Sequence, residues 1–162
     1  KLKLDALNSF QGVQRRQQVL VDRADLTVIE DFGHHPTALD LTLESLRARY
    51  PKHRLVACFE PRSNTAARKV MQDAFREALK QADEVFLAPP HRADKLGEER
   101  FDSAGVAAAI NAAGKKGFAP ASNEALLAEL TAVVKGDRSP RCVIFFSNGA
   151  FGGIIKKFAQ AV

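Results

Sequence analysis

The sequence of 162 residues contains no tryptophan, one tyrosine and one methionine. No apolar run approaches the roughly 20 residues that a helix needs to cross a bilayer, so we expect no contact with a membrane. Residues 1–5 lack the apolar core of a secretory signal peptide. The phosphate-binding motif Gly-x-x-x-x-Gly-Lys-[Ser/Thr] is absent, so the chain carries no P-loop of its own.

Cysteine is also scarce. Cys58 and Cys142 both lie within apolar runs, and neither belongs to a Cys-x-x-Cys pair. Such a pattern is typical of buried free thiols in a reducing compartment, which points to the cytoplasm. A zinc site is not expected, because zinc usually takes three or four protein ligands.

The charge is moderately positive, with 24 Lys and Arg against 19 Asp and Glu. A solvated basic surface, nucleic-acid binding and binding of small polyanions are all compatible with this excess. The scarcity of aromatic residues beside basic ones argues against nucleic acid. A solvated surface with scattered charge is the default interpretation, and binding of small polyanions is the more specific hypothesis.

The hydrophobic periodicity predicts strands that alternate with helices. Continuous apolar strands in that alternation favour a mostly parallel sheet with helices on both faces. We therefore predict a Rossmann-like α/β domain with three layers and about six strands. Strands are expected at Val19–Val21, Leu26–Ile29, Arg54–Phe59, Glu84–Ala88, near Phe118 and, as the central strand, at Cys142–Phe146. Helices are expected at Thr37–Arg49, Thr65–Gln81, through 106–110, through 126–133 and at Ile154–Ala161.

Several details of these elements follow from the side chains. The helix at Thr65–Gln81 is predicted to turn Val70, Ala74, Phe75 and Ala78 inward. Caps are expected at Asp102 and at Ser122 or Asn123. The polar stretch 91–100 is expected to be a loop or an insertion at the ligand edge of the sheet. Residues 1–17 do not fit the alternation, and we interpret them as a helix (4–10) and a tail that connect to a missing upstream domain.

The most informative stretch is Glu30-Asp31-Phe32-Gly33-His34-His35-Pro36-Thr37, between a strand and a helix. It puts a carboxylate and two imidazoles at the carboxyl end of a strand, where open α/β sheets bind ligands. The following helix N-terminus favours anions. A metal site is not predicted, because adjacent histidines cannot easily face one ion and no further cluster of ligands lies nearby.

Three motifs together resemble the C-terminal domain of the Mur ligases, the ATP-dependent enzymes that build cell-wall peptides. The first is Asp-x-x-His-x-Pro, here Asp31, His34 and Pro36. The second is Phe-x-Gly-x-x-Arg-Arg, here Phe10 to Arg16. The third is the tail Ser147-Asn148-Gly149-Ala150-Phe151-Gly152-Gly153-Ile154, similar to the ending found in the murein-recycling branch of the family.

The resemblance implies roles for individual residues. Arg16 would contact the nucleotide phosphates, which suits a planar guanidinium, and Asp31 would contact the nucleotide on its ribose side. The substrate peptide would be bound by His34, Arg62, Asn64, Ser147 and Asn148. No complete catalytic set lies in this chain. ATP and Mg²⁺ would be bound mainly by a central domain upstream, so residues 1–17 become the connector and residues 18–162 the C-terminal domain.

The reaction that the resemblance implies joins L-alanyl-γ-D-glutamyl-meso-diaminopimelate to UDP-N-acetylmuramate in the bacterial cytoplasm, during recycling of cell-wall peptides. The domain would present the peptide and close over ATP through a hinge at 11–17. The segment Phe59-Glu60-Pro61-Arg62-Ser63-Asn64 supports the recycling branch. It keeps one arginine beside the proline, where the L-alanine-adding branch has bulkier residues and a second arginine.

Two other interpretations remain open. One is the L-alanine-adding branch itself, with the same chemistry and a smaller nucleophile. The other is a non-catalytic α/β ligand-binding module, because the chain lacks a complete catalytic set. For the recycling ligase, the expected partners are UDP-N-acetylmuramate, the tripeptide and the upstream domains of the same protein, with no nucleic acid and no membrane.

Overall fold

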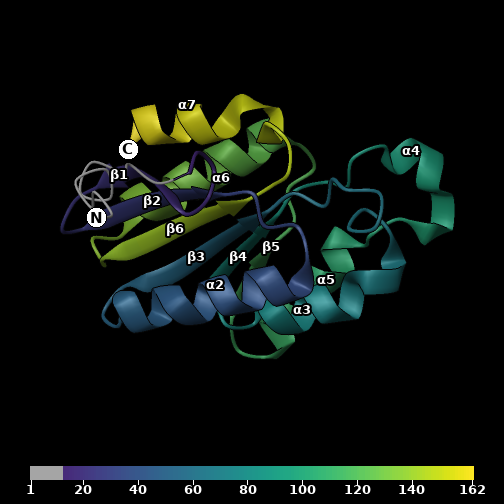
Figure 1. Ribbon diagram of the computed structural model, residues 1–162, viewed down its shortest axis with the longest axis horizontal. Helices are drawn as coiled ribbons and strands as arrows, with labels where there is room; N and C mark the ends of the chain where they lie inside the picture. The colour runs from purple at the N-terminus through teal and green to yellow at the C-terminus, as the bar shows by residue number, and fades with distance from the viewer. Residues whose placement is uncertain (1–12) are drawn as a thin grey trace, which may run out of the picture.

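The computed structural model describes residues 13–162 and confirms the α/β fold (Figure 1). The strands are β1 (Gln18–Asp22), β2 (Leu26–Asp31), β3 (Arg54–Phe59), β4 (Glu84–Leu87), β5 (Lys116–Phe118) and β6 (Arg141–Phe146). The helices are α2 (Pro36–Arg49), α3 (Gln72–Leu79), α4 (Ala93–Leu96), α5 (Ser103–Ala112), α6 (Asn123–Gly136) and α7 (Ile154–Ala161). Short 3-10 turns occupy Lys69–Met71, Gly97–Glu99 and Phe151–Gly153.

One sheet holds all six strands in the order β1-β2-β6-β3-β4-β5. Five strands are parallel, and β1 pairs with β2 in the antiparallel sense, with a register shift between Val19 and Val21. The apolar strand β6 lies between β2 and β3, which confirms its predicted central position.

Two helical layers cover the sheet, and the strand β6 shows how the sequence divides between them. Ile144 and Phe146 pack in the cluster that contains the buried residues of α2, α3 and α5. Val143 and Phe145 pack in the second cluster, with α6 and α7. Because successive side chains of a strand point to opposite faces, a strand covered on both faces is apolar throughout.

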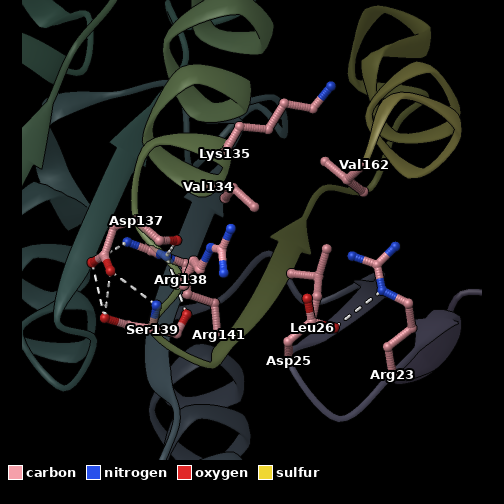
Figure 2. A pocket seen from close by; sticks show the side chains of 10 residues that line it. All are labelled: Arg23, Asp25, Leu26, Val134, Lys135, Asp137, Arg138, Ser139, Arg141 and Val162. Carbon is pink, nitrogen blue, oxygen red and sulfur yellow. Dashed lines mark hydrogen bonds and ion pairs between the residues drawn. The ribbon is translucent and has the colours of Figure 1, made fainter.

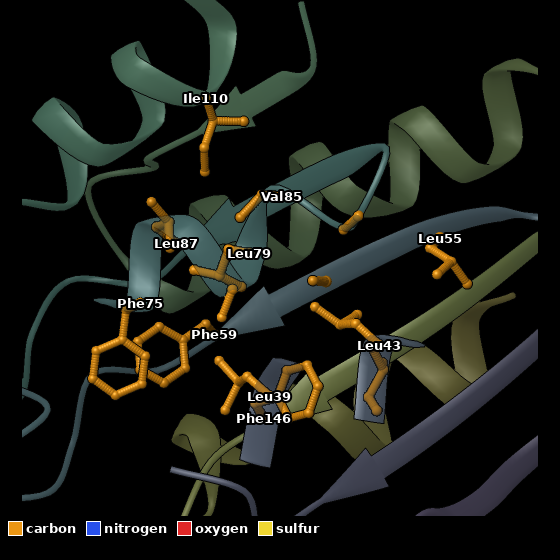
Figure 3. Packing of buried hydrophobic residues seen from close by; sticks show 14 of the residues in the cluster. Leu39, Leu43, Leu55, Phe59, Phe75, Leu79, Val85, Leu87, Ile110 and Phe146 are labelled. Atoms are coloured by element: carbon orange, nitrogen blue, oxygen red, sulfur yellow. The ribbon is translucent and has the colours of Figure 1, made fainter. Parts of the chain in front are cut away.

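The first cluster contains a group of packed aromatic rings. Phe59 and Phe75 stack with centroids 4.6 Å apart, and both meet Phe101 edge to face. Figure 3 shows Leu39 and Phe146 completing this layer. Complete burial of one such side chain contributes about 1.5–3 kcal/mol to folding.

The predicted caps are confirmed. The Asp102 carboxylate accepts the Gly105 backbone N–H (2.9 Å), and the Ser122 hydroxyl accepts that of Ala125 (3.1 Å). Helix α2 begins at Pro36, where a proline is favourable because the first helical N–H needs no partner within the helix.

The helix predicted at Thr65–Gln81 is wrong in its first half. Residues 65–67 form a turn, Arg68 a bridge and Lys69–Met71 a 3-10 turn, so α3 begins only at Gln72. Val70 is 75% exposed and Ala74 is also exposed, whereas Phe75 and Ala78 are buried as predicted. The backbone of Arg68 forms an antiparallel bridge with Arg100, which takes this segment out of helical geometry.

The polar stretch 91–100 forms an excursion that contains α4 and a 3-10 turn, and in Figure 1 it extends away from the sheet. The predicted strand near Phe118 and the last helix at Ile154–Ala161 are confirmed. The expected helix at 4–10 lies outside the described residues. Within residues 13–162, no helix has the length and apolarity needed to span a bilayer.

Candidate functional site

The carboxyl edge of the sheet brings together most of the predicted site residues. β2, β6 and β3 end in register, so that Asp31, Phe146 and Phe59 stand side by side. Beyond them, the Ser147 N–H donates to the Asp31 carbonyl (3.1 Å). The Glu60 N–H donates to the Phe146 carbonyl across the same distance. The loops after these strands therefore start as neighbours.

The segment that leads into β1 is fastened to this edge by Arg15, a residue to which the sequence analysis gave no role. Its guanidinium pairs with Glu30 (2.8 Å) and donates to the carbonyls of Ser147 (2.9 Å) and Gly149. Its carbonyl accepts the Phe32 N–H at 2.7 Å. Arg15 adopts a φ of 59°, which only these several contacts make tolerable for a side chain of this size.

Asp31 is buried, and both of its carboxylate oxygens are engaged. Oδ1 accepts the Gly33 N–H (2.6 Å) and Oδ2 accepts the Gln17 N–H (2.9 Å). Arg16 lies beside it, with its guanidinium 5.3 Å from the centre of the Phe32 ring. Arg16 and Asp31 line one hollow of 420 Å³, together with Gln17 and the outer face of α2.

The two histidines occupy different positions. His34 is half-buried, with Nδ1 3.1 Å from the Phe32 carbonyl and its ring edge-on to the Phe32 ring. His35 is exposed and precedes α2 as its N-cap residue, with no capping bond from its side chain. The geometry thus separates a packed imidazole from a solvated one.

Ser147 connects the ends of β6 and β3. Its hydroxyl donates to Glu60 Oε2 and accepts the Gly149 N–H (2.9 Å). Glu60 is 5% exposed, and its other oxygen lies 3.6 Å from the guanidinium of Arg62. Ser147 is itself buried, so it acts by holding the loop and the carboxylate that positions Arg62.

The Arg62 side chain crosses directly over Gly149. A Cβ at position 149 would lie 2.2 Å from both Cδ and Nε of Arg62. The glycine of the predicted Ser-Asn-Gly motif is therefore required for a close approach between an arginine and the backbone.

A hollow of 550 Å³ opens beyond Arg62. Three predicted residues line it: Arg62, Asn64 and Asn148. The Oδ1 atom of Asn148 is buried and has no hydrogen-bond partner within residues 13–162. A buried acceptor of this kind is costly unless a ligand or water supplies a donor.

Three further basic residues line the hollow and were not predicted to bind substrate: Arg68, His91 and Arg92. Arg68 pairs with Glu99 at the surface, and Arg92 is exposed with a φ of 56°. The signal for His91 and Arg92 was present, because they come soon after β4 and the polar stretch was expected to be a loop or an insertion at the ligand edge. Three guanidinium groups around one hollow suit an anionic ligand with several carboxylates.

A model of the family described as "Mur ligase, glutamate ligase domain" matches residues 15–149. Curated relatives include UDP-N-acetylmuramate–L-alanine ligases from Desulforapulum autotrophicum and Hydrogenovibrio crunogenus. The first is 33% identical over 69% of this chain and 24% of its own length. The second is 31% identical over 96% of this chain and 34% of its own length. The chain thus spans only about a quarter to a third of these relatives.

Solved structures give a similar result. The murein peptide ligase of Psychrobacter arcticus superposes with a TM-score of 0.73 and 26% identity, over 97% of this chain and 32% of that one. The second structure is a domain from a putative UDP-N-acetylmuramate:L-alanyl-γ-D-glutamyl-diaminopimelate ligase of Haemophilus ducreyi. It matches with a TM-score of 0.64 and 25% identity, over 90% of this chain and 98% of that one. The family resemblance seen in the sequence is confirmed: the chain belongs to the Mur ligase family, as its C-terminal, glutamate ligase domain.

Proposed function

We propose that this chain is the peptide-binding C-terminal domain of an ATP-dependent ligase. The complete enzyme would join L-alanyl-γ-D-glutamyl-meso-diaminopimelate to UDP-N-acetylmuramate in the bacterial cytoplasm. The observation that carries the proposal is the hollow beyond Arg62, with three arginines and a buried, unpartnered amide oxygen. Its 550 Å³ lies in the range of small-molecule sites.

The chemistry of the tripeptide fits this hollow. The tripeptide carries several carboxylates, which arginines bind through paired hydrogen bonds, and amide and amino N–H groups, for which Asn148 Oδ1 is an acceptor. L-Alanine has a single carboxylate and could engage only one or two of the three arginines. In this arrangement Arg62, supported by Glu60 and Ser147, anchors a carboxylate so that the peptide's amine points toward the upstream domain.

The nucleotide side of the proposal rests on Arg16 and Asp31. Arg16 has no carboxylate partner within residues 13–162, so its guanidinium is available to a phosphate. The Asp31 oxygens each accept one backbone N–H and retain lone pairs for a ribose hydroxyl. ATP supplies the phosphoryl group that activates the muramate carboxylate. We assign the P-loop and the Mg²⁺ ligands to the upstream domain, joined through residues 1–17.

A second candidate is the L-alanine-adding reaction. The observation that favours it is the sequence comparison, since relatives of that activity reach 42% identity over 55% of the chain. In that case Arg68 and, in the excursion, Arg92 would serve no substrate group.

Titration of the 162-residue chain with the tripeptide and, separately, with L-alanine tests the proposal. The Haemophilus ducreyi domain, of which 98% is matched here, was crystallised as a domain alone, so the isolated chain is a reasonable sample. We expect chemical-shift changes at Arg62, Arg92 and Asn148 with the tripeptide only. Replacement Arg92→Gln should weaken binding roughly tenfold or more, from the loss of a charge-assisted hydrogen bond.

Arg100→Gln is the matched control, because Arg100 is an exposed arginine of the same excursion that does not line the hollow. Equal responses to the tripeptide and L-alanine would favour the second candidate. A loss of binding in Arg100→Gln as large as in Arg92→Gln would contradict the location of the peptide site.

A further inference from the structure

The edge of the sheet opposite the peptide hollow carries the positive charge of the chain. This amino edge consists of the strand starts, the connections that lead into them and the last turns of the preceding helices, at residues 22–26, 46–54, 76–84, 109–116 and 133–141. These ranges hold 12 Lys and Arg against 6 Asp and Glu, a net charge of +6. The rest of the sequence holds 12 against 13, so its net charge is −1.

Much of this charge is not neutralised locally. Arg54, Lys116 and Arg141 share the buried carboxylate of Glu84, and Arg47 and Lys115 share Asp83. Lys52, Lys135 and Arg138 are exposed and have no ion-pair partner within residues 13–162. Asp83 and Glu84 thus each serve more than one cation, and the three free cations face water.

The edge also has a hollow of 520 Å³, lined by four cations and two carboxylates among others: Arg23, Lys135, Arg138, Arg141, Asp25 and Asp137. Figure 2 shows Arg23 on one side of this hollow and Arg138 and Lys135 on the other. The cations therefore come from the β1–β2 turn, from α6 and from the α6–β6 turn, and they surround a space large enough for an anionic headgroup.

We propose that the amino edge binds the domain to an anionic phospholipid surface. This inference goes beyond the ligase activity and departs from the expectation, drawn from the sequence, of no contact with a membrane. Clustered Lys and Arg bind anionic bilayers through a diffuse field, and such binding needs no apolar insertion.

Other polyanionic partners fit the edge less well. Protein partners usually require aromatic or aliphatic anchors at the centre of the interface. The exposed large hydrophobic residues of the described chain, Val13, Val19, Leu41 and Val70, all lie outside the amino edge. Single-stranded nucleic acid requires aromatic platforms for its bases, and the edge offers only Tyr50, half-buried against His53.

The position of the edge is compatible with ligase function. Residues 13–17, the linker, meet the sheet at its carboxyl edge, where the Phe32 N–H donates to the Arg15 carbonyl. The hollow beyond Arg62, proposed to bind the peptide, opens at that same edge. A bilayer against the amino edge would leave both of them accessible from water.

Sedimentation of the 162-residue chain with vesicles tests the proposal. We expect binding to vesicles of phosphatidylglycerol and phosphatidylcholine but not to phosphatidylcholine alone. Binding at low salt should disappear near 0.3 M salt, because screening shortens the reach of surface charges. The triple variant Lys52→Gln, Lys135→Gln, Arg138→Gln should bind about 100-fold more weakly, at roughly fivefold per cation.

The matched control is Lys69→Gln, Lys156→Gln, Lys157→Gln. It removes the same charge from three exposed lysines outside the amino edge, which also lack ion-pair partners within residues 13–162. Retained binding in this control supports the proposal, and an equal loss in both triple variants overturns it. Failure of the native chain to sediment with anionic vesicles at low salt overturns it as well. Retention on duplex DNA without sedimentation would assign the edge to nucleic acid instead.

Discussion

One hydrogen bond between Asp31 and Gln17 fixes the path by which the chain enters the sheet. The Gln17 N–H donates to Asp31 Oδ2 across 2.9 Å, while the other oxygen of Asp31 holds Gly33. The carboxylate that we assign to the nucleotide side therefore also ties the linker to the end of β2. A ligand that drew Asp31 away from Gln17 would at the same time release the linker.

Asp31→Asn should destabilise the domain by about 1–3 kcal/mol, because the new amide nitrogen would face a backbone N–H and leave it unsatisfied. Urea unfolding measures this loss, and faster amide exchange at Gln17 would locate it. Asp22→Asn is the control, since Asp22 is exposed at the end of β1. Unchanged exchange at Gln17 would show that the carboxylate does not hold the linker.

Ser147→Ala should cost a similar amount, about 1–3 kcal/mol, because it leaves a buried carboxylate oxygen of Glu60 and the Gly149 N–H without their partner. Ser45→Ala on the exposed face of α2 should be nearly neutral. Denaturant unfolding of the two variants under the same conditions gives the comparison. Equal stability of both variants would contradict the hydrogen bond from Ser147 to Glu60.

Gly149→Ala should affect binding more than folding. The added methyl group would occupy the space of the Arg62 side chain and push its guanidinium from the hollow. We expect tripeptide affinity to fall roughly tenfold or more, by calorimetric titration, through the lost contact of Arg62. At Gly136 a Cβ meets nothing within 4 Å, so Gly136→Ala should bind normally.

The pH dependence of stability should include a contribution from Asp83. Burial opposes ionisation of this carboxyl, but hydrogen bonds from Arg47 and the Leu55 N–H outweigh it and hold the pKa of Asp83 below its ordinary value. A lowered folded-state pKa stabilises the fold above the unfolded value of about 3.9 and loses that effect as the pH falls through the folded pKa. Asp83→Asn should therefore be less stable than the native chain near neutral pH, and the difference should shrink below about pH 3.9. Urea unfolding across this range measures the difference, and a constant gap would contradict the assignment.

The two thiols should be inert in the folded protein. Burial raises the pKa of the Cys142 thiol to about 12 and that of Cys58 well above its ordinary value. Because the thiolate is the reactive form, alkylation by iodoacetamide near pH 8 should require unfolding. Mass spectrometry of the native and urea-unfolded chain distinguishes the two states, and rapid alkylation of either cysteine in the native chain would contradict the buried placement.

Local patterns were sufficient for most of the fold. The apolar run at 142–146 predicted a central strand, because only a strand buried on both faces can be apolar throughout. Asp102 and Ser122 predicted helix starts, because their side chains satisfy backbone N–H groups a few residues away. These interactions lie within one element or between its neighbours in sequence.

The errors have a different origin. The helix predicted from Thr65 fails because Arg68 pairs with Arg100, a partner 32 residues away that local periodicity cannot reveal. For the same reason local patterns could not show that Arg68 would line one hollow with Arg62. A functional role was predicted for Arg16 and none for Arg15. Nothing in the local sequence distinguishes an arginine held by distant carbonyls from one that stays solvated.

The strand order sets a lever arm for the peptide hollow. The linker, residues 13–17, meets the sheet at the end of β2. Arg62 follows β3 and Arg92 follows β4, and β4 lies three strand positions from β2. At about 4.8 Å per strand the hollow lies roughly 14 Å from the pivot. Once the contacts of Arg15 and Gln17 are released, a rotation of about 20° at Gln17 would carry a bound peptide by about 5 Å, roughly one and a half residues of extended chain. Under the proposed function, a pivot at one end of the sheet would convert a small backbone change into the travel that an amine needs to approach or leave a reaction centre.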